Sequence, residues 1–149
     1  MASDTSAPSQ GTMNLMNKVH RALLKLTGGR IGWRLAGMPM LELTTTGRKS
    51  GEPRSTMLSS PMQPDGSYII VASRGGDDKH PAWFLNLVAN SAVDVVFTGA
   101  ASERRIARVA TPAERAKLWP VIAAEHKNYG EYQEKTDREI PLVFLDPAA

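Results

Sequence analysis

Residues 41–54 read LELTTTGRKSGEPR, and this stretch decides the expected fold. Leu41 and Leu43 alternate with polar residues, which is the period of a half-buried β-strand, and the threonines that follow favour extended backbone. Gly47 and Gly51 then bound a tight turn, after which a second extended run begins. The stretch therefore predicts a β-hairpin, in which a strand, a short turn and a returning strand follow one another.

The turn of this predicted hairpin is basic. Arg48, Lys49 and Arg54 oppose a single acid, Glu52. Backbone N–H groups in a glycine-bounded turn, together with Arg and Lys side chains, are typical of a site for an anion such as a phosphate. Charged residues are also usual in solvated turns, so an exposed turn without a ligand is the alternative interpretation.

The composition of the 149-residue chain fits one globular domain with its own core. Its net charge of +3 suits an anionic ligand or a membrane surface, but is too small to indicate nucleic-acid binding. Without cysteine, disulfides and thiolate chemistry are excluded, and His20, His80 and His126 lack the spacing of a metal site. No apolar run has the length of a transmembrane helix and no signal peptide is evident, so we expect a cytoplasmic protein.

The N-terminal part shows two patterns. Residues 1–11 are rich in Ser, Ala and Pro, and we expect a disordered tail there. Residues 12–26 carry apolar residues at helical spacing, with Lys18, Arg21 and Lys25 on the other face. Such a helix either makes peripheral contact with an anionic membrane or packs against its own domain, and both interpretations stay open.

The remaining elements follow from periodicity and turn residues. We expect strands over 55–60, 68–72, 92–97, 101–109 and 140–145, and helices over 77–89 and from 111 onward. For the helix from 111, Thr111 and Glu114 predict a capping box, and Pro120 is expected to kink or reset the helix. Residues 30–39 are expected to form a loop. Hairpin-length connections favour an antiparallel sheet or small barrel, in a single domain over 12–149.

Two further segments carry candidate site residues. Ser73–Gly76 ends the strand over 68–72 with a hydroxyl, a cation and two glycines, which suits an anion or a polar ring edge, with a simple loop as the alternative. Pro81 fits the first position of the next helix. Further on, His126, Tyr129 and Tyr132 share one edge if the chain is helical there, although Gly130 argues against a regular helix. Such rings either wall a planar ligand or pack in the core.

Four blocks of sequence carry a family resemblance. They are LTTTGRKSGEPR at 43–54, VASRGG at 71–76, HPAWFLNLVANS at 80–91, and the Tyr129/Tyr132 pair followed by TDREIP at 136–141. In order and spacing they resemble the deazaflavin (F420)-dependent nitroreductase family, over roughly residues 41–145. This resemblance implies an actinobacterial protein with a split β-barrel and flanking helices, of mainly β or α+β class, related to FMN-binding proteins of the pyridoxamine-phosphate-oxidase type.

The same resemblance implies a cofactor and a reaction. The cofactor would be reduced coenzyme F420, a 5-deazaflavin with a phosphate and an oligoglutamate tail, which passes a hydride to a quinone, nitroaromatic or enone acceptor. Two alternatives remain, a non-catalytic F420 or lipid carrier of this fold and an FMN-dependent oxidoreductase. The basic hairpin favours F420 over FMN, because a long acidic tail needs more cations than one phosphate.

The resemblance also assigns residues to the site. The cofactor-binding residues would be Arg48, Lys49, Ser50, Gly51, Arg54, Met57, Ala72, Ser73, Arg74, Gly75, Gly76, Ala82, Trp83, Asn86 and Tyr129. The catalytic residues would be Ser73, Tyr129, Tyr132 and His126, with no metal. The Ser73 and Tyr129 hydroxyls would stabilise developing negative charge, and His126, in place of a family tyrosine, would donate a proton or lie on the surface. Arg74 stands where a lysine is expected, which keeps the charge but changes the geometry.

Overall fold

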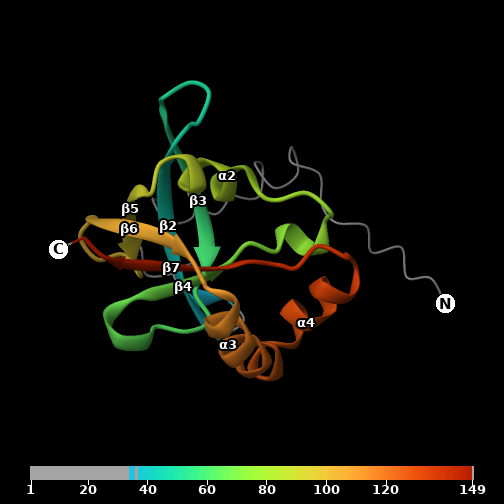
Figure 1. Cartoon of the computed structure of the whole chain (residues 1–149). Helices are drawn as coiled ribbons and strands as arrows, with labels where there is room; N and C mark the ends of the chain where they lie inside the picture. Colours follow the sequence, from blue (N-terminus) through green and yellow to red (C-terminus); the bar gives the residue numbers. More distant parts are fainter. Residues whose placement is uncertain (1–33, 36, 149) are drawn as a thin grey trace.

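The computed structural model describes residues 34–35 and 37–148, and the structural statements below concern these residues. The strands are β1 (Arg34–Leu35), β2 (Met38–Thr46), β3 (Pro53–Ser59), β4 (Tyr68–Val71), β5 (Ala92–Phe97), β6 (Glu103–Val109) and β7 (Leu142–Pro147) (Figure 1). The helices are α2 (Ala82–Ala89), α3 (Pro112–Glu125) and α4 (Lys127–Glu134), with short 3-10 turns η1 (Pro64–Gly66) and η2 (Arg74–Gly76). The predicted tail over 1–11 and amphipathic helix over 12–26 lie outside the described residues.

The strands form one antiparallel sheet that curls back on itself. β2 pairs with β1, β3 and β5, and beyond β5 the order is β6, β7 and β4. The ends of this order meet again, because the Ser60 hydroxyl after β3 donates to the Ile69 carbonyl of β4 at 2.7 Å, and Met62 forms a β-bridge with Ile69. The sheet is thus a barrel that is not fully closed, and the predicted split β-barrel is confirmed.

The hairpin on which the sequence analysis depended is the β2–β3 pair, which projects from the barrel at the top of Figure 1. Its strands are joined by paired hydroxyls, with Thr44 Oγ1 and Ser55 Oγ 2.7 Å apart. The turn is closed by backbone bonds from Gly47 N to Glu52 O and from Gly51 N to Gly47 O, both 2.8 Å. Gly51 has a φ of 72°, which glycine adopts without steric cost.

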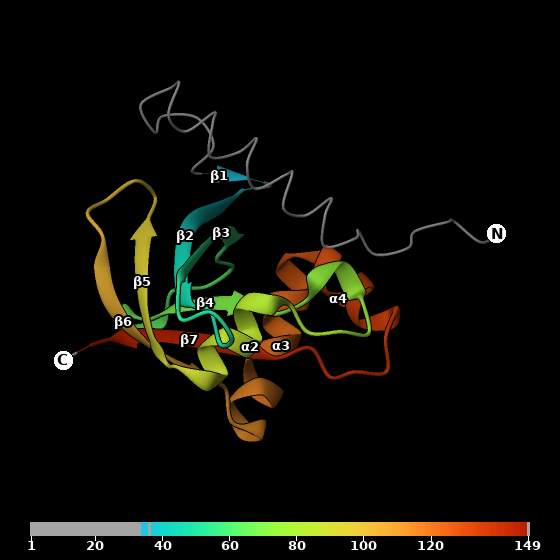
Figure 2. The same cartoon turned by 90° about the horizontal axis from the view of Figure 1, so that it is seen from above.

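Two hydrophobic clusters hold the elements together. The first fills the barrel and includes Leu41, Leu43, Ile70, Val93, Val95, Val143 and Leu145, with Trp83, Phe84 and Leu87 from α2. The second lies between the β4–β7 side of the sheet and helices α3 and α4 (Figure 2), and includes Ile69, Val71, Ile122, Tyr129, Ile140, Leu142 and Phe144. Because α2 contributes to the first cluster, its position relative to the barrel is fixed by core packing.

Two expectations about the bounds of local elements were wrong. The predicted loop over 30–39 includes β1 and the start of β2, because Gly37, with a φ of 77°, reverses the chain so tightly that its flanks pair. The helix expected over 77–89 begins only at Ala82. Pro81 is its cap, with extended backbone (ψ 149°), and the chain before it is held by contacts from a distant segment described below.

Helix α3 was expected to kink or reset at Pro120, but it continues to Glu125. Both Pro120 and Ala116, whose carbonyl loses its helical donor, are exposed, so water can satisfy that carbonyl. Helix α4 then follows directly and runs through Gly130. The predicted capping box is confirmed, because the Glu114 amide donates to Thr111 Oγ1 at 3.2 Å and the Thr111 amide donates to the Glu114 carboxylate at 2.9 Å.

Candidate functional site

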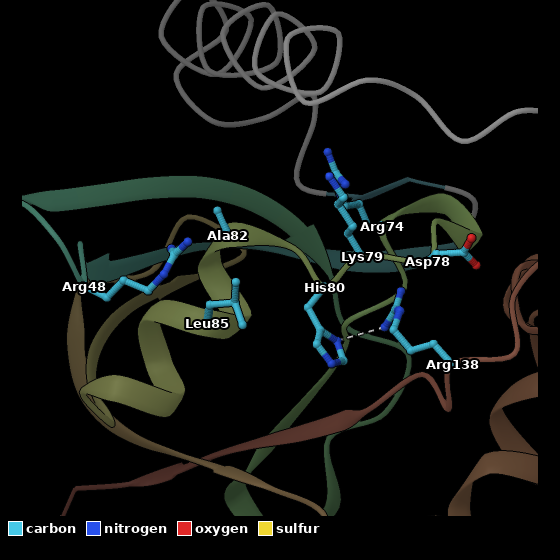
Figure 3. Close-up of a pocket in the computed structure, with 8 residues that line it drawn as sticks. All are labelled: Arg48, Arg74, Asp78, Lys79, His80, Ala82, Leu85 and Arg138. Atoms are coloured by element: carbon cyan, nitrogen blue, oxygen red, sulfur yellow. Dashed lines mark hydrogen bonds between the residues drawn. The ribbon is translucent and has the colours of Figure 1, made fainter.

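A pocket of about 530 Å³ lies beside the β2–β3 turn and the start of α2 (Figure 3). Its lining residues are Arg48, Arg74, Asp78, Lys79, His80, Ala82, Leu85 and Arg138. Figure 3 shows Arg48 on one side of Ala82 and Leu85, and Arg74 and Arg138 on the other. Four of these residues are cationic and one is a carboxylate. A concave site with this balance attracts a ligand that carries several negative charges.

Asn86 fixes the basic turn to helix α2. Its side chain is buried, with 4% exposed, and its Oδ1 accepts from the Arg48 amide at 3.2 Å and from Arg48 Nη1 at 3.0 Å. Its Nδ2 donates to Thr45 Oγ1 at 3.1 Å. The sequence analysis assigned Asn86 to the cofactor, but both its polar atoms are engaged by the hairpin. Its structural role is therefore to position Arg48 at the rim of the pocket.

The other cations of the turn are exposed. Neither Lys49 nor Arg54 forms an ion pair within residues 37–148, although Arg54 Nη2 donates weakly to Ser50 Oγ at 3.4 Å. Ser50 Oγ also accepts from the Glu52 amide at 3.2 Å. A Cβ at Gly47 would lie 2.6 Å from Ser50 Oγ and 3.2 Å from the Glu52 carbonyl, so a larger residue there would displace the Ser50 hydroxyl. The geometry leaves two positive charges available to an anion.

The second predicted loop, Ser73–Gly76, is a tight turn with unusual backbone. Arg74, Gly75 and Gly76 have φ values of 46°, 64° and 86°, and a left-handed conformation at a non-glycine residue is typical of functional sites. A Cβ on Gly76 would lie 2.7 Å from the Tyr132 carbonyl, so the turn packs directly on α4. This contact brings two of the predicted segments together.

The side chain of Arg74 is the best evidence that the pocket fits an anion. Its Nη1 pairs with Asp77 Oδ2 at 2.5 Å, and only 11% of the side chain is exposed. Its Nε is buried and has no acceptor among the described residues. A buried donor without a partner costs about 1–3 kcal/mol, so a ligand oxygen at this point would relieve a real penalty.

Arg138 and His80 complete the wall of the pocket. Arg138 lies between α4 and β7, and its Nη1 donates to His80 Nδ1 at 3.0 Å (Figure 3). Burial lowers the pKa of His80, and the charge of Arg138 lowers it further. The His80 ring also lies against Phe84, with 4.6 Å between ring centroids. The imidazole is therefore favoured in its neutral form.

The aromatic residues near α4 form an edge-to-face series. His126 and Tyr129 have ring centroids 6.2 Å apart, and Tyr129 and Tyr132 are 6.3 Å apart. Tyr129 is buried in the second core cluster, where its hydroxyl donates to Met38 Sδ at 3.6 Å, and burial raises its pKa well above the usual range. None of these three residues lines the pocket of Figure 3, although the backbone of Tyr132 packs against Gly76 of the second loop.

The remaining candidates differ in exposure. Met57, Ala72 and Trp83 are buried, and Trp83 packs edge-on against Phe84, whereas Ala82 is exposed at the pocket. The sequence analysis missed Asp78, Lys79, His80, Leu85 and Arg138, all of which line the pocket. His80 and Arg138 stood inside the quoted blocks HPAW and TDREIP, which was the available signal.

Two features are absent from the residues that the structure describes, a metal-binding cluster and a membrane-spanning helix. They contain no cluster of three or more His, Cys, Asp or Glu side chains placed to hold a metal ion. Within the same residues, no helix has the length and apolar character needed to cross a membrane.

The chain is similar to known proteins in both sequence and fold. Residues 16–147 match the family described as F420H(2)-dependent quinone reductase. The chain is 38% identical over 135 residues to the F420H(2)-dependent quinone reductase Rv1261c of Mycobacterium tuberculosis, which covers 86% of this chain and 87% of that protein. Among solved structures, an F420-H2 dependent reductase, FDR-A, is 39% identical with a TM-score of 0.64, covering 72% of this chain and 94% of that one. Another solved structure, described as a domain-swapped dimer, is 35% identical to this chain with a TM-score of 0.66. The match covers 92% of this chain and 100% of that chain.

These matches confirm the resemblance drawn from the four blocks of sequence. They agree in the cofactor, because both the family and the relatives are named for reduced coenzyme F420. The chain belongs to the F420H(2)-dependent quinone reductase family, a family of oxidoreductases.

Proposed function

We propose that this chain binds reduced coenzyme F420 with its basic turn and cationic pocket, and reduces a quinone. The observation that supports this most strongly is the group of cations at one end of the barrel, in which Arg74 Nε is buried without an acceptor. A cofactor with a phosphate and an acidic tail needs several charge-assisted hydrogen bonds. Arg48, Lys49 and Arg54, which are exposed on the turn, would supply them.

The residues of the chain would bind, orient and protect, while the bound deazaflavin supplies the hydride. The Ser73 hydroxyl, next to Arg74, is our first candidate for a donor to the oxygen that gains negative charge. Tyr129 is the second candidate. Its hydroxyl is protonated at neutral pH, but in this structure it is buried and donates to Met38 Sδ at 3.6 Å, so this role would need the ligand to replace Met38 as its acceptor. His126, edge-on to Tyr129, remains the candidate for a proton source.

Comparing the binding of F420 with that of FMN tests this proposal. Fluorescence titration of the full chain should show F420 binding that weakens as salt is raised, and much weaker binding of FMN. The reason is that F420 carries more negative charge, and each ionic contact is screened by salt. Tighter binding of FMN than of F420 would support the FMN-dependent alternative instead.

The finer choice of acceptor is part of the proposal. We expect quinones such as menadione to be reduced in preference to bulky nitroimidazoles, with nitroaromatics and enones as poorer acceptors. His126 is shorter than tyrosine and widens the edge that it shares with Tyr129. Replacing His126 with tyrosine should shift the ratio of kcat/KM values toward nitro compounds by up to about tenfold, the scale of one aromatic contact of roughly 1 kcal/mol. An unchanged ratio would mean that His126 does not contact the acceptor.

We also propose peripheral membrane contact through residues 12–26, because quinone acceptors are found in lipid. The three cations of that segment, Lys18, Arg21 and Lys25, should give weak and salt-sensitive binding to anionic vesicles if the segment forms the predicted amphipathic helix. Sedimentation of the full chain with such vesicles measures it, and neutral vesicles are the control. If a triple replacement of these three residues by glutamine sediments like the wild type, the segment does not bind the membrane.

A further inference from the structure

Arg138 connects the chain between α4 and β7 to the loop that carries the pocket cations. Its Nη1 donates to the Ala72 carbonyl at 3.0 Å and its Nη2 to the Ser73 carbonyl at 3.0 Å. The Asp77 carbonyl accepts from Nη2 at 2.8 Å and from Nε at 3.2 Å. Three carbonyls of one loop are thus satisfied by one guanidinium, whose planar fork of five N–H donors suits this task better than an ammonium group.

The segment that holds Arg138 is itself fixed. The Arg138 amide donates to Thr136 Oγ1 at 3.1 Å, and its carbonyl accepts from Gln133 Nε2 at 2.7 Å. Thr136 Oγ1 in turn donates to Asp78 Oδ1 at 2.7 Å, which adds a second link to the same loop. Because Thr136 follows α4 directly, the position of the loop depends on that of the helix.

The contact with His80 determines the state of its ring. An arginine has no acceptor, so His80 Nδ1 must accept, and the proton of the neutral ring must be on Nε2. A second proton would place two positive charges side by side. The other charged groups that line the same pocket are Arg48, Arg74, Asp78 and Lys79, of which only Asp78 would favour a charged ring, and its carboxylate is engaged by Thr136.

We propose that Arg138 is a positioning residue of the cofactor site. It holds the Ser73–His80 loop in the conformation that presents Arg74 and Lys79 to the ligand, and it keeps His80 as a neutral hydrogen-bond donor through Nε2. Without it, the left-handed turn at Arg74 would lose the contacts that hold its flanks. The identity of the ligand rests on the proposed function, whereas the conformation of the loop and the protonation of His80 are independent of it.

The first test uses the protein without cofactor. NMR titration should show that His80 in the wild type has the Nε2–H tautomer and a pKa below 6.5, and that Arg138→Met raises this pKa. His80→Asn identifies the resonance and keeps an acceptor for Arg138. Hydrogen exchange of the Gly76 and Asp77 amides, which donate to Ser73 and Arg74 carbonyls, should be at least about tenfold faster in Arg138→Met.

The lysine variant separates charge from geometry. Arg138→Lys should keep the low pKa of His80, because the charge remains, but the loop amides should still exchange faster, because the fork is lost. An unchanged His80 pKa and unchanged loop exchange in a folded Arg138→Met protein would overturn the proposal. Arg138→Lys takes the place of Arg138→Met if the methionine variant does not fold. The proposal would then be overturned if the loop amides of Arg138→Lys exchange as slowly as those of the wild type.

The pH dependence of stability follows from the lowered pKa of His80. Between the lowered pKa of the folded state and about 6.5, His80 binds more protons in the unfolded chain than in the folded one. The free energy of unfolding therefore rises with pH through this window, and the contribution of His80 is fully present above it. In His80→Asn this rise should be smaller. An identical pH dependence in both proteins would show that His80 is not held neutral in the folded state.

Cofactor binding gives an independent readout. At pH 7.5 the affinity of Arg138→Met for F420 should be about tenfold lower than that of the wild type, because the loop that carries Arg74 and Lys79 is no longer held in place. Equal affinities of the two proteins would count against the positioning role. If the wild type does not bind F420, the proposed function fails, and the NMR and exchange results still decide the role of Arg138.

Discussion

Replacing Asn86 with leucine is expected to lower the free energy of unfolding by about 2–4 kcal/mol, because polar groups would remain buried without partners. Thr45 is 1% exposed and would lose the Asn86 Nδ2 donor at 3.1 Å. The Arg48 amide would lose its acceptor at 3.2 Å, and its guanidinium would lose the same oxygen. Leucine has the same number and branching of side-chain heavy atoms, so the loss would come from hydrogen bonding rather than from a cavity.

Urea denaturation measures this change, and Val88→Ala is the matched control. Val88 lies on the same helix and is 60% exposed, so its replacement should change stability by less than about 0.5 kcal/mol. In a folded Asn86→Leu protein, F420 affinity should also fall, since Arg48 is no longer held at the rim. Wild-type stability together with wild-type affinity would show that α2 does not position the turn.

Replacing Arg54 with alanine is expected to weaken F420 binding by one to two decades, roughly. A charge-assisted hydrogen bond contributes about 1.5–3 kcal/mol, and about 1.4 kcal/mol corresponds to a factor of ten. Arg54 is exposed and its one described side-chain contact, with Ser50 Oγ at 3.4 Å, is weak, so the guanidinium is available to a ligand. The effect should therefore appear in binding and not in stability.

Fluorescence titration at two salt concentrations measures the effect. Raising the salt should weaken the wild type more than Arg54→Ala, because the variant has one ionic contact fewer to be screened. Lys117→Ala is the control for net charge, since Lys117 is exposed on α3, at the opposite end of the molecule from the turn in Figure 1. Equal affinities of Arg54→Ala and Lys117→Ala would remove Arg54 from the site.

The barrel could be predicted because its signals are local. Alternating residues over β2, β5 and β6, the glycine-bounded turn and the capping box at Thr111 each act within a few positions of the chain. Where prediction failed, a short-range signal was misjudged or absent. At 30–39 the pairing depended on the backbone of Gly37, and at 77–89 the Asp77 carbonyl was already bound by Arg138, 61 residues away.

The site was predicted less completely for the same reason. Asn86 was predicted to bind the cofactor, and the structure shows its side chain bound to residues 38 and 41 positions away along the chain, which belong to the hairpin. In the sequence His80 has no partner nearby, whereas in the structure it contacts Arg138, which lies 58 residues later in the chain. From its spacing, Tyr129 could either wall a ligand or pack in the core, and the second core cluster buries it. Periodicity shows that residues share a face, but only the tertiary fold shows what that face contacts.

The central claim is that this chain is a reductase and not a carrier of the cofactor. The most direct measurement follows the visible absorbance of F420 after the full chain, preloaded with F420H2, is mixed with menadione. We expect the absorbance of the oxidised deazaflavin to appear far faster than in the same mixture without protein, with equal amounts of oxidised cofactor and reduced quinone. Tight binding of F420H2 with oxidation no faster than in the protein-free mixture would contradict a reductase and indicate a carrier.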